Sequence, residues 1–190
     1  MKSKIALRTF KDKYIDSLIR IFASSIKMTC AKDYSNEQID AWLSGADKAR
    51  WILVLNSHYS LIAFKGDVPV GFGDISDDGY LNMLYVHPEY QNKGVATLIC
   101  DALERHVEKD ITVDASITAK NFFLKRGYEV ISEQTVYRKG IALNNFKMKK
   151  TYSNPEIGKR YGYLTVIEET DKRYHSTRIY KCRCDCGNII

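Results

Sequence analysis

A short turn joins a strand-like apolar segment, residues 81–86, to a helical pattern that begins after Gly94. The N-terminus of a helix carries unpaired backbone N–H groups and a partial positive charge, so it binds phosphate readily. Gly94 and Ala96 are small residues that leave those groups accessible, and Lys93 adds a cation. The residue types and their spacing therefore indicate a site for a phosphate or diphosphate group.

The turn by itself does not decide between a ligand site and a plain connection. Gln91 can hold a phosphate oxygen or can simply fix the loop, and a strand, a turn and a helix with one glycine also occur without any ligand. The sequence contains neither a G-x-x-x-x-G-K-[ST] loop nor a G-x-G-x-x-G loop in the right context. A mononucleotide site of those two kinds is therefore not expected.

The elements around the turn predict an α/β domain. Apolar residues at helical spacing and strand-like runs give the order β-α-α-β-β-β-α-β-α-β-β. The second expected helix starts with a capping box formed by Ser35 and Gln38. The expected strands cover residues 4–10, 60–64, 70–75, 81–86, 111–115, 128–138 and 141–148, and the expected helices cover residues 12–27, 35–43, 95–106 and 118–126. This order predicts a mixed sheet with a right-handed strand–helix–strand unit at its middle.

The turn and its surroundings resemble the acetyl-CoA signature of the Gcn5-related N-acetyltransferase (GNAT) family. That signature reads [QR]-x-x-G-x-[GA], and this chain has Gln91, Gly94 and Ala96 at its three fixed positions, after the strand "LYVHPEYQ". The segment "ASITAKNFFLKRGYEV" is similar to the family's second block. The resemblance extends over about residues 5–149. It implies a GNAT fold for residues 1–150, with a mixed, mostly antiparallel central sheet flanked by helices.

The resemblance also implies that acetyl-CoA is the co-substrate, and it assigns the residues that bind it. In the family, the acetyl thioester lies where the fourth and fifth strands separate. Leu84, Tyr85 and Val86 would offer backbone groups to the pantetheine arm and the acetyl carbonyl. The pyrophosphate would be bound by Gln91, Asn92, Lys93, Gly94, Val95, Ala96 and Thr97. Ser116 replaces an asparagine that often contacts the cofactor, and Asn121 is the expected polar substitute.

The residues for proton transfer are less well defined, because Phe123 stands where the family often has a tyrosine. Attack of a neutral amine on a thioester needs a route for the amine proton and a proton for the leaving thiolate. Tyr85 and Tyr137 are candidate acids, and protonation of the thiolate by solvent is a third alternative. The candidate bases are carboxylates expected on strands, which the sequence does not rank: Asp74, Asp114 and Glu133.

The resemblance places the acceptor between the first two helices and the last hairpin. Tyr34 and Trp42 are candidate aromatic contacts, and Asn82 stands where other members often carry an acid. A small-molecule amine is the main interpretation of the acceptor, whose identity stays open. Two alternatives are a non-catalytic acyl-CoA-binding regulatory module and a protein-modifying acetyltransferase recruited through its tail. Many enzymes of this fold pair through the last strands, so a homodimer is a further expectation.

The pattern changes in residues 151–190, which predict a small β-rich appendage. Its last expected strand ends in Cys182, Cys184 and Cys186, three thiols within five residues, which resembles the first half of a zinc-binding β-ribbon. A closed zinc site needs a fourth ligand, which His175 or a second chain would have to supply. The preferred interpretation is an incomplete ribbon without metal.

Composition and charge argue against several other functions. The 190 residues carry a formal net charge of +6, from 29 basic and 23 acidic residues, and the excess is dispersed. Nucleic-acid binders usually concentrate charge on one face, so a nucleic-acid partner is not expected. No apolar run is long enough to span a membrane, and the first residues lack the apolar core of a signal peptide. We therefore expect a cytoplasmic protein, in which the isolated Cys30 and Cys100 stay reduced.

Overall fold

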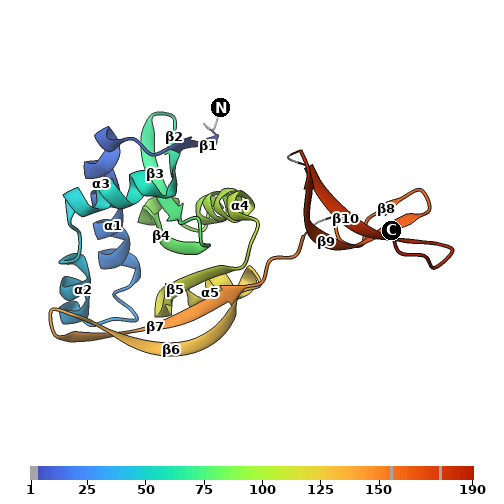
Figure 1. Ribbon diagram of the computed structural model, residues 1–190. Coiled ribbons are helices and arrows are strands. Elements are labelled where there is room, and N and C mark those ends of the chain that lie inside the picture. Colours follow the sequence, from blue (N-terminus) through green and yellow to red (C-terminus); the bar gives the residue numbers. More distant parts are fainter. Residues whose placement is uncertain (1–3, 155, 176) are drawn as a thin grey trace. The chain divides into compact units, whose positions relative to one another are not determined.

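The chain forms two compact units, Met1–Thr151 and Tyr152–Ile190. The computed structural model describes residues 4–154, 156–175 and 177–190 (Figure 1). Within these ranges, no helix is both long enough and apolar enough to cross a membrane.

A central sheet organises the first unit, and its described residues form seven strands in the order β1-β2-β3-β4-β5-β7-β6. Neighbouring strands are antiparallel except β4 and β5, which are parallel. The strands are β1 (Ile5–Thr9), β2 (Tyr59–Lys65), β3 (Val68–Ile75), β4 (Tyr80–Val86), β5 (Ile111–Ser116), β6 (Glu129–Arg138) and β7 (Ile141–Lys150). This mixed, mostly antiparallel sheet confirms the predicted fold class.

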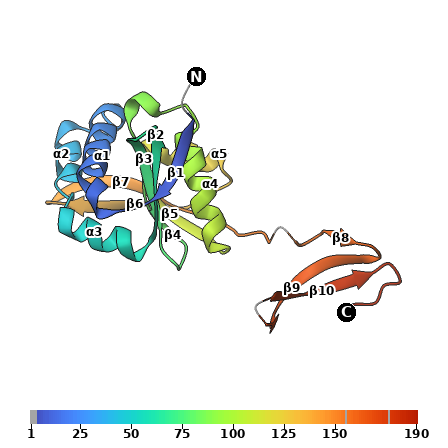
Figure 2. The ribbon, with the colours of Figure 1, turned by 90° about the horizontal axis from the view of Figure 1, so that it is seen from above.

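Helices cover both faces of the sheet. Helices α1, α2 and α3 lie on one face, and α4 and α5 lie on the other (Figure 2). Each face has its own apolar core, with Leu18 and Phe22 of α1 in one and Ile99 and Leu103 of α4 in the other. The helices are α1 (Ile15–Thr29), α2 (Asn36–Leu43), α3 (Lys48–Ser57), α4 (Val95–Val107) and α5 (Ile117–Lys125), with short 3-10 turns η1 (Asp12–Tyr14) and η2 (Pro88–Tyr90).

Helix α3 corrects the predicted order of elements, which contained two helices before the second strand. Residues 51–55 are all apolar, and such a run lacks the helical spacing by which the other helices are recognised. Trp51 and Leu55, which are four positions apart, are buried in the core shared by α1 and the sheet. Asp47 caps this helix by accepting the backbone N–H of Arg50 at 2.9 Å. Packing of one helical face against the sheet therefore decides the structure of this segment.

Strands β4 and β5 pair only at their beginnings and then separate. Among the described residues, the pairing consists of Tyr80 with Thr112 and Leu81 with Val113. From Asn82 onward, the edge of β4 that faces β5 therefore has backbone groups without a strand partner. This opening in the sheet creates the space in which the candidate site lies.

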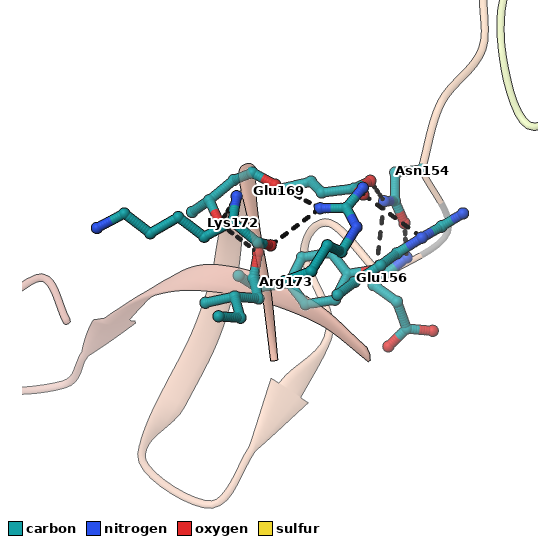
Figure 3. A network of polar contacts seen from close by, with 9 residues as sticks. Asn154, Glu156, Glu169, Lys172 and Arg173 are labelled. Carbon is teal, nitrogen blue, oxygen red and sulfur yellow. Dashed lines mark hydrogen bonds and ion pairs between the residues drawn. The ribbon is translucent and has the colours of Figure 1, made fainter. Parts of the chain in front are cut away.

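The second unit is a small sheet in the order β10-β9-β8, which confirms the predicted β-rich appendage. Its strands are β8 (Arg160–Tyr161), β9 (Leu164–Tyr174) and β10 (Thr177–Cys184). A polar network stabilises one end of it, where Glu169 accepts hydrogen bonds from Asn154 and Arg173 at 2.5 and 3.0 Å (Figure 3).

The three cysteines of the tail lie at the end of β10. Cys182 and Cys184 are half-buried on the strand, and Cys186 is exposed just after it. Over the described ranges, no group of three or more His, Cys, Asp or Glu side chains is arranged to hold a metal ion.

Candidate active site

A cavity of about 580 Å³ opens where β4 and β5 separate. Residues of β4, β5 and the turn before α4 line it, together with parts of α1 and α5. Most residues predicted to bind acetyl-CoA line this cavity: Leu84, Tyr85, Val86, Gln91, Asn92, Gly94, Val95, Ala96 and Thr97.

Helix α4 begins at this cavity, and among the described residues no side chain caps its first turn. Gly94 precedes the helix with φ 79° and ψ 2°, which is the left-handed region that favours glycine. No side chain of the described residues accepts a hydrogen bond from this helix start, and Val95, Ala96 and Thr97 line the cavity. The N–H groups and the partial positive charge of the helix are therefore available to an anion in the cavity.

Gln91 fixes the turn to the preceding strand and to α1. Its Nε2 donates to the carbonyl of Val86 at 3.0 Å and to the hydroxyl of Thr29 at 2.9 Å. Of the two roles that the sequence leaves open for Gln91, these contacts favour fixing the loop. Lys93 is exposed, and its Nζ donates to the carbonyl of Glu89 at 2.7 Å instead of lining the cavity.

A second cavity, of about 180 Å³, adjoins the first. Trp42, Asn82 and Tyr85 line both cavities, so these three residues form the junction between them. Aromatic rings build the walls of the second cavity. Phe22 meets the rings of Trp51 and Tyr85 edge to face, with centroids 5.0 and 4.9 Å apart. The site thus combines a large compartment at a helix N-terminus with a small aromatic compartment.

A buried carboxylate holds Asn82 at this junction. Asp74 on β3 is fully buried, and its Oδ2 accepts a hydrogen bond from Nδ2 of Asn82 at 3.0 Å. The same oxygen lies 2.7 Å from Nδ1 of His58. Burial raises the pKa of Asp74, and the hydrogen bonds with Asn82 and His58 oppose that rise. Asp74 lines neither cavity, so its connection to the junction is the hydrogen bond with Asn82.

The raised pKa of Asp74 predicts a pH dependence of stability. The folded state keeps this proton at pH values where the unfolded state has already lost it, so stability falls as pH rises from 3.8 through the folded pKa. We expect a chain with Asp74 to lose free energy of unfolding relative to Asp74→Asn over this window. The two chains that are compared both contain the substitution His58→Gln, so that no histidine side chain lies beside position 74. Urea denaturation between about pH 4 and pH 7 gives the free energy of unfolding of the Asp74 chain minus that of the Asp74→Asn chain. We expect this value to fall as pH rises, and a value that stays flat or rises would contradict the prediction.

This arrangement, with a sheet that opens between two parallel strands beside a helix start, has counterparts among known proteins. Residues 30–151, more than half of the 190 residues, match the family model of the acetyltransferase (GNAT) domain. The chain belongs to the GNAT family. The uncharacterized N-acetyltransferase YafP of Escherichia coli K12 is 36% identical over 148 residues, which cover 77% of this chain and 96% of YafP.

Solved structures show the same fold. A GCN5-related N-acetyltransferase from Rhodopseudomonas palustris has 39% sequence identity and a TM-score of 0.76, over 80% of this chain and 98% of that one. The PaiA N-acetyltransferase from Thermoplasma acidophilum, solved in complex with coenzyme A, has 22% identity and a TM-score of 0.66, over 78% and 99% of the two chains. The GNAT fold expected from the sequence is therefore confirmed.

This GNAT domain has a phenylalanine at the expected position of the acid. Phe123 is buried, lines the first cavity and meets Tyr128 edge to face, with centroids 5.0 Å apart. Tyr85 lies at the junction of the two cavities. Burial raises the pKa of Tyr85, so its hydroxyl keeps its proton at neutral pH.

Three other predicted site residues of the GNAT domain do not line either cavity. Tyr137 is 71% exposed on β6, and Asn121 is exposed on α5. Tyr34 is buried, and its hydroxyl donates to the carbonyl of Asn144 at 2.8 Å and accepts the N–H of Ile117 at 2.9 Å. Tyr34 thereby ties β7 to the start of α5. These positions give the three residues no direct contact with a ligand in the cavities.

The remaining candidate bases lie in different places. Asp114 on β5 lines the first cavity and accepts a hydrogen bond from the hydroxyl of Tyr80 at 3.3 Å. Glu133 on β6 is exposed and lines neither cavity. Ser116 lines the first cavity and caps α5 by accepting the N–H of Ala119 at 3.1 Å. Of these carboxylates, Asp114 has direct access to the first cavity.

Sequence reasoning missed several residues of the site. One is His58, which the pairing of β2 with β3 places beside Asp74. Sequence reasoning also missed Arg50 and Arg138, which line the second cavity. No spacing in the sequence signals these contacts, because the residues come from separate elements that only the folded sheet and helices bring together.

Proposed function

We propose that this chain is an acetyl-CoA-dependent N-acetyltransferase that acts on a small amine. The observation that carries the proposal is the first cavity, which runs from the unpaired edge of β4 to the uncapped start of α4. The PaiA N-acetyltransferase, which has the same fold, was solved with coenzyme A. A long ligand with an anionic diphosphate at one end matches such a cavity.

In this proposal, different residues bind the pantetheine arm and the diphosphate of acetyl-CoA. The backbone of Leu84, Tyr85 and Val86 bonds the pantetheine arm, because it has no strand partner on the β5 side. The turn and the first residues of α4 bind the diphosphate. Gln91 holds the turn in place, since its side chain is occupied by Val86 and Thr29.

The small cavity receives the acceptor in this proposal, and the junction is where the two substrates meet. The amine nitrogen attacks the thioester carbonyl carbon, a C–N bond forms, and the C–S bond breaks as coenzyme A leaves as a thiolate. The amine gives up one proton to water, the thiolate takes one from its donor, and water restores the proton of that donor, so the protons balance. Asn82, held by Asp74, orients the acceptor, and Tyr85 supplies the proton to the thiolate.

Removal of the Tyr85 hydroxyl tests the proton donor. We expect Tyr85→Phe to lower kcat by about tenfold and to leave acetyl-CoA affinity unchanged, because a thiolate is a tolerable leaving group that solvent can also protonate. Tyr128→Phe is the matched control, because Tyr128 is buried, has a pKa raised mainly by burial, donates a hydrogen bond from its hydroxyl to Glu104 and lines neither cavity. Full activity of Tyr85→Phe would assign the proton to solvent.

The test of the function itself is turnover. The purified chain is titrated with acetyl-CoA by calorimetry and then incubated with acetyl-CoA and a panel of small amines, while release of the free thiol is measured. Binding and amine-dependent release are the expected results. Binding without release for any amine would favour a non-catalytic acyl-CoA-binding module, for which Phe123 is the motivating feature. Activity on a protein that is lost on deletion of residues 152–190 would favour a tail-recruited enzyme.

A further inference from the structure

Two arginines line the small aromatic cavity. Arg50 comes from the first turn of α3, and Arg138 comes from the end of β6. The other lining residues among those described are aromatic, apolar or neutral, and none is acidic. The cavity therefore combines apolar walls with two positive charges and has no lining carboxylate to balance them.

In the described ranges, neither arginine side chain forms an ion pair or a hydrogen bond with another residue. Arg126 shows the contrasting case, because its guanidinium lies 2.7 Å from Asp101 and 3.0 Å from Glu104. The carboxylate nearest in sequence to Arg50 is Asp47, which caps α3 through the backbone N–H of Arg50 and lines neither cavity.

The position of Arg50 is not explained by the stability of the helix that carries it. The start of a helix already has a partial positive charge, so an arginine in the first turn of α3 is unfavourable there. The charge of Arg138 acts on the junction, because it opposes the rise that burial causes in the pKa of Tyr85. Both guanidinium groups are therefore available to an anion that enters the cavity.

We infer that the acceptor is a small apolar or aromatic amine that carries a carboxylate. This inference rests on the proposed function and names its substrate class. Arginine binds carboxylates through paired hydrogen bonds, and the rings of Phe22, Trp42 and Trp51 fit a flat apolar body. A carboxylate held by Arg50 and Arg138 directs the amine toward the junction. The two positive charges also favour the neutral form of that amine, which is the form that attacks the thioester.

The cavity contains its own reporter of binding. The chain has two tryptophans, Trp42 and Trp51, and both line the cavity. A ligand in the cavity therefore changes the tryptophan fluorescence of the full chain, with no need for turnover. The probes are two matched pairs, phenylalanine with phenylalaninamide and 4-(aminomethyl)benzoate with its amide, which differ in the carboxylate alone.

The variants are Arg50→Gln and Arg138→Gln, with Arg20→Gln as the control. Arg20 is an exposed arginine of α1 whose Nη2 donates to Ser17 at 3.0 Å, and it lines neither cavity. We expect saturable binding of at least one carboxylate probe, about tenfold tighter than that of its amide. Each cavity variant should weaken the binding of that probe by about tenfold, and the control should leave it unchanged.

Several results would overturn the inference. They are equal affinity for a carboxylate and its amide, tighter binding of 1,4-diaminobutane than of either carboxylate, unchanged binding in both cavity variants, and no saturable change with any probe. Acetylation is measured separately, so the two proposals can fail separately. Carboxylate binding without thiol release would refute catalysis and keep this inference. Acetylation only of amines that lack a carboxylate would keep the proposed catalysis and refute this inference.

Discussion

Gly94→Glu is expected to weaken acetyl-CoA binding by at least about 100-fold, which corresponds to roughly 2.7 kcal/mol. Two effects act together at this position. Gly94 has φ 79°, where a side chain strains the backbone by about 1–2 kcal/mol. The new carboxylate also stands at the start of α4, where the proposed diphosphate needs positive charge. Calorimetric titration of wild type and variant with acetyl-CoA measures the loss.

A matched control separates the site from the backbone effect. Gly66, in the turn between β2 and β3, also has a positive φ, of 63°. At both Gly66 and Gly94, an added Cβ would have no atom within 4 Å. Gly66→Glu thus introduces the same charge and a similar strain away from the cavity, and we expect it to bind acetyl-CoA like the wild type. Gly94→Ala keeps the strain without the charge, and we expect an intermediate loss. Unchanged binding by Gly94→Glu would show that the start of α4 does not hold the diphosphate.

The turn and most of its neighbouring elements could be predicted from sequence because their determinants are local. The sequence places the small residue Gly94 directly before the helical pattern, and α4 begins there, with Gly94 in the left-handed conformation that a glycine adopts without strain. Ser35 and Gln38 form the predicted capping box, with Gln38 N–H donating to the Ser35 hydroxyl at 3.2 Å and Ser35 N–H donating to Gln38 Oε1 at 3.0 Å. Interactions over three or four residues leave a signature in spacing, so the pattern was sufficient there.

The proposed acceptor side could be predicted only in part: the family resemblance gave Trp42 and Asn82, which line the cavities, but it did not give the arginines, because packing rather than spacing brings them there. The junction draws Trp42 from α2 and Asn82 from β4, and the cavity beside it adds Arg138 from β6. Tyr34 shows the converse. Its ring packs edge to face on Trp42, with centroids 5.4 Å apart, but its hydroxyl forms hydrogen bonds with the backbone of β7 and α5. An aromatic residue near the right position in the sequence can therefore support the wall of a site without reaching the ligand.

Gly79→Ala is expected to lower the free energy of unfolding of the first unit by about 3–4 kcal/mol, because strain and overpacking add. Gly79 is buried between β3 and β4, with φ 91°. A methyl group there would collide with the backbone oxygen of Asp110, which cannot move away as a flexible side chain could. The carbonyl of Gly79 accepts the N–H of Thr112 at 2.9 Å, so the residue also starts the pairing of β4 with β5. Urea denaturation measures the loss.

Gly66→Ala provides the matched control for this substitution. It imposes a similar positive φ of 63° with open space around the methyl group, so it should cost about 1–2 kcal/mol from strain alone. The excess loss in Gly79→Ala then measures how closely β4 is held to the start of β5. If the two variants lose the same stability, the approach of Gly79 to Asp110 is not a fixed feature. If the excess is present, β4 and β5 are held together at this end. Beyond Leu81 their pairing stops, and acetyl-CoA is proposed to bind there.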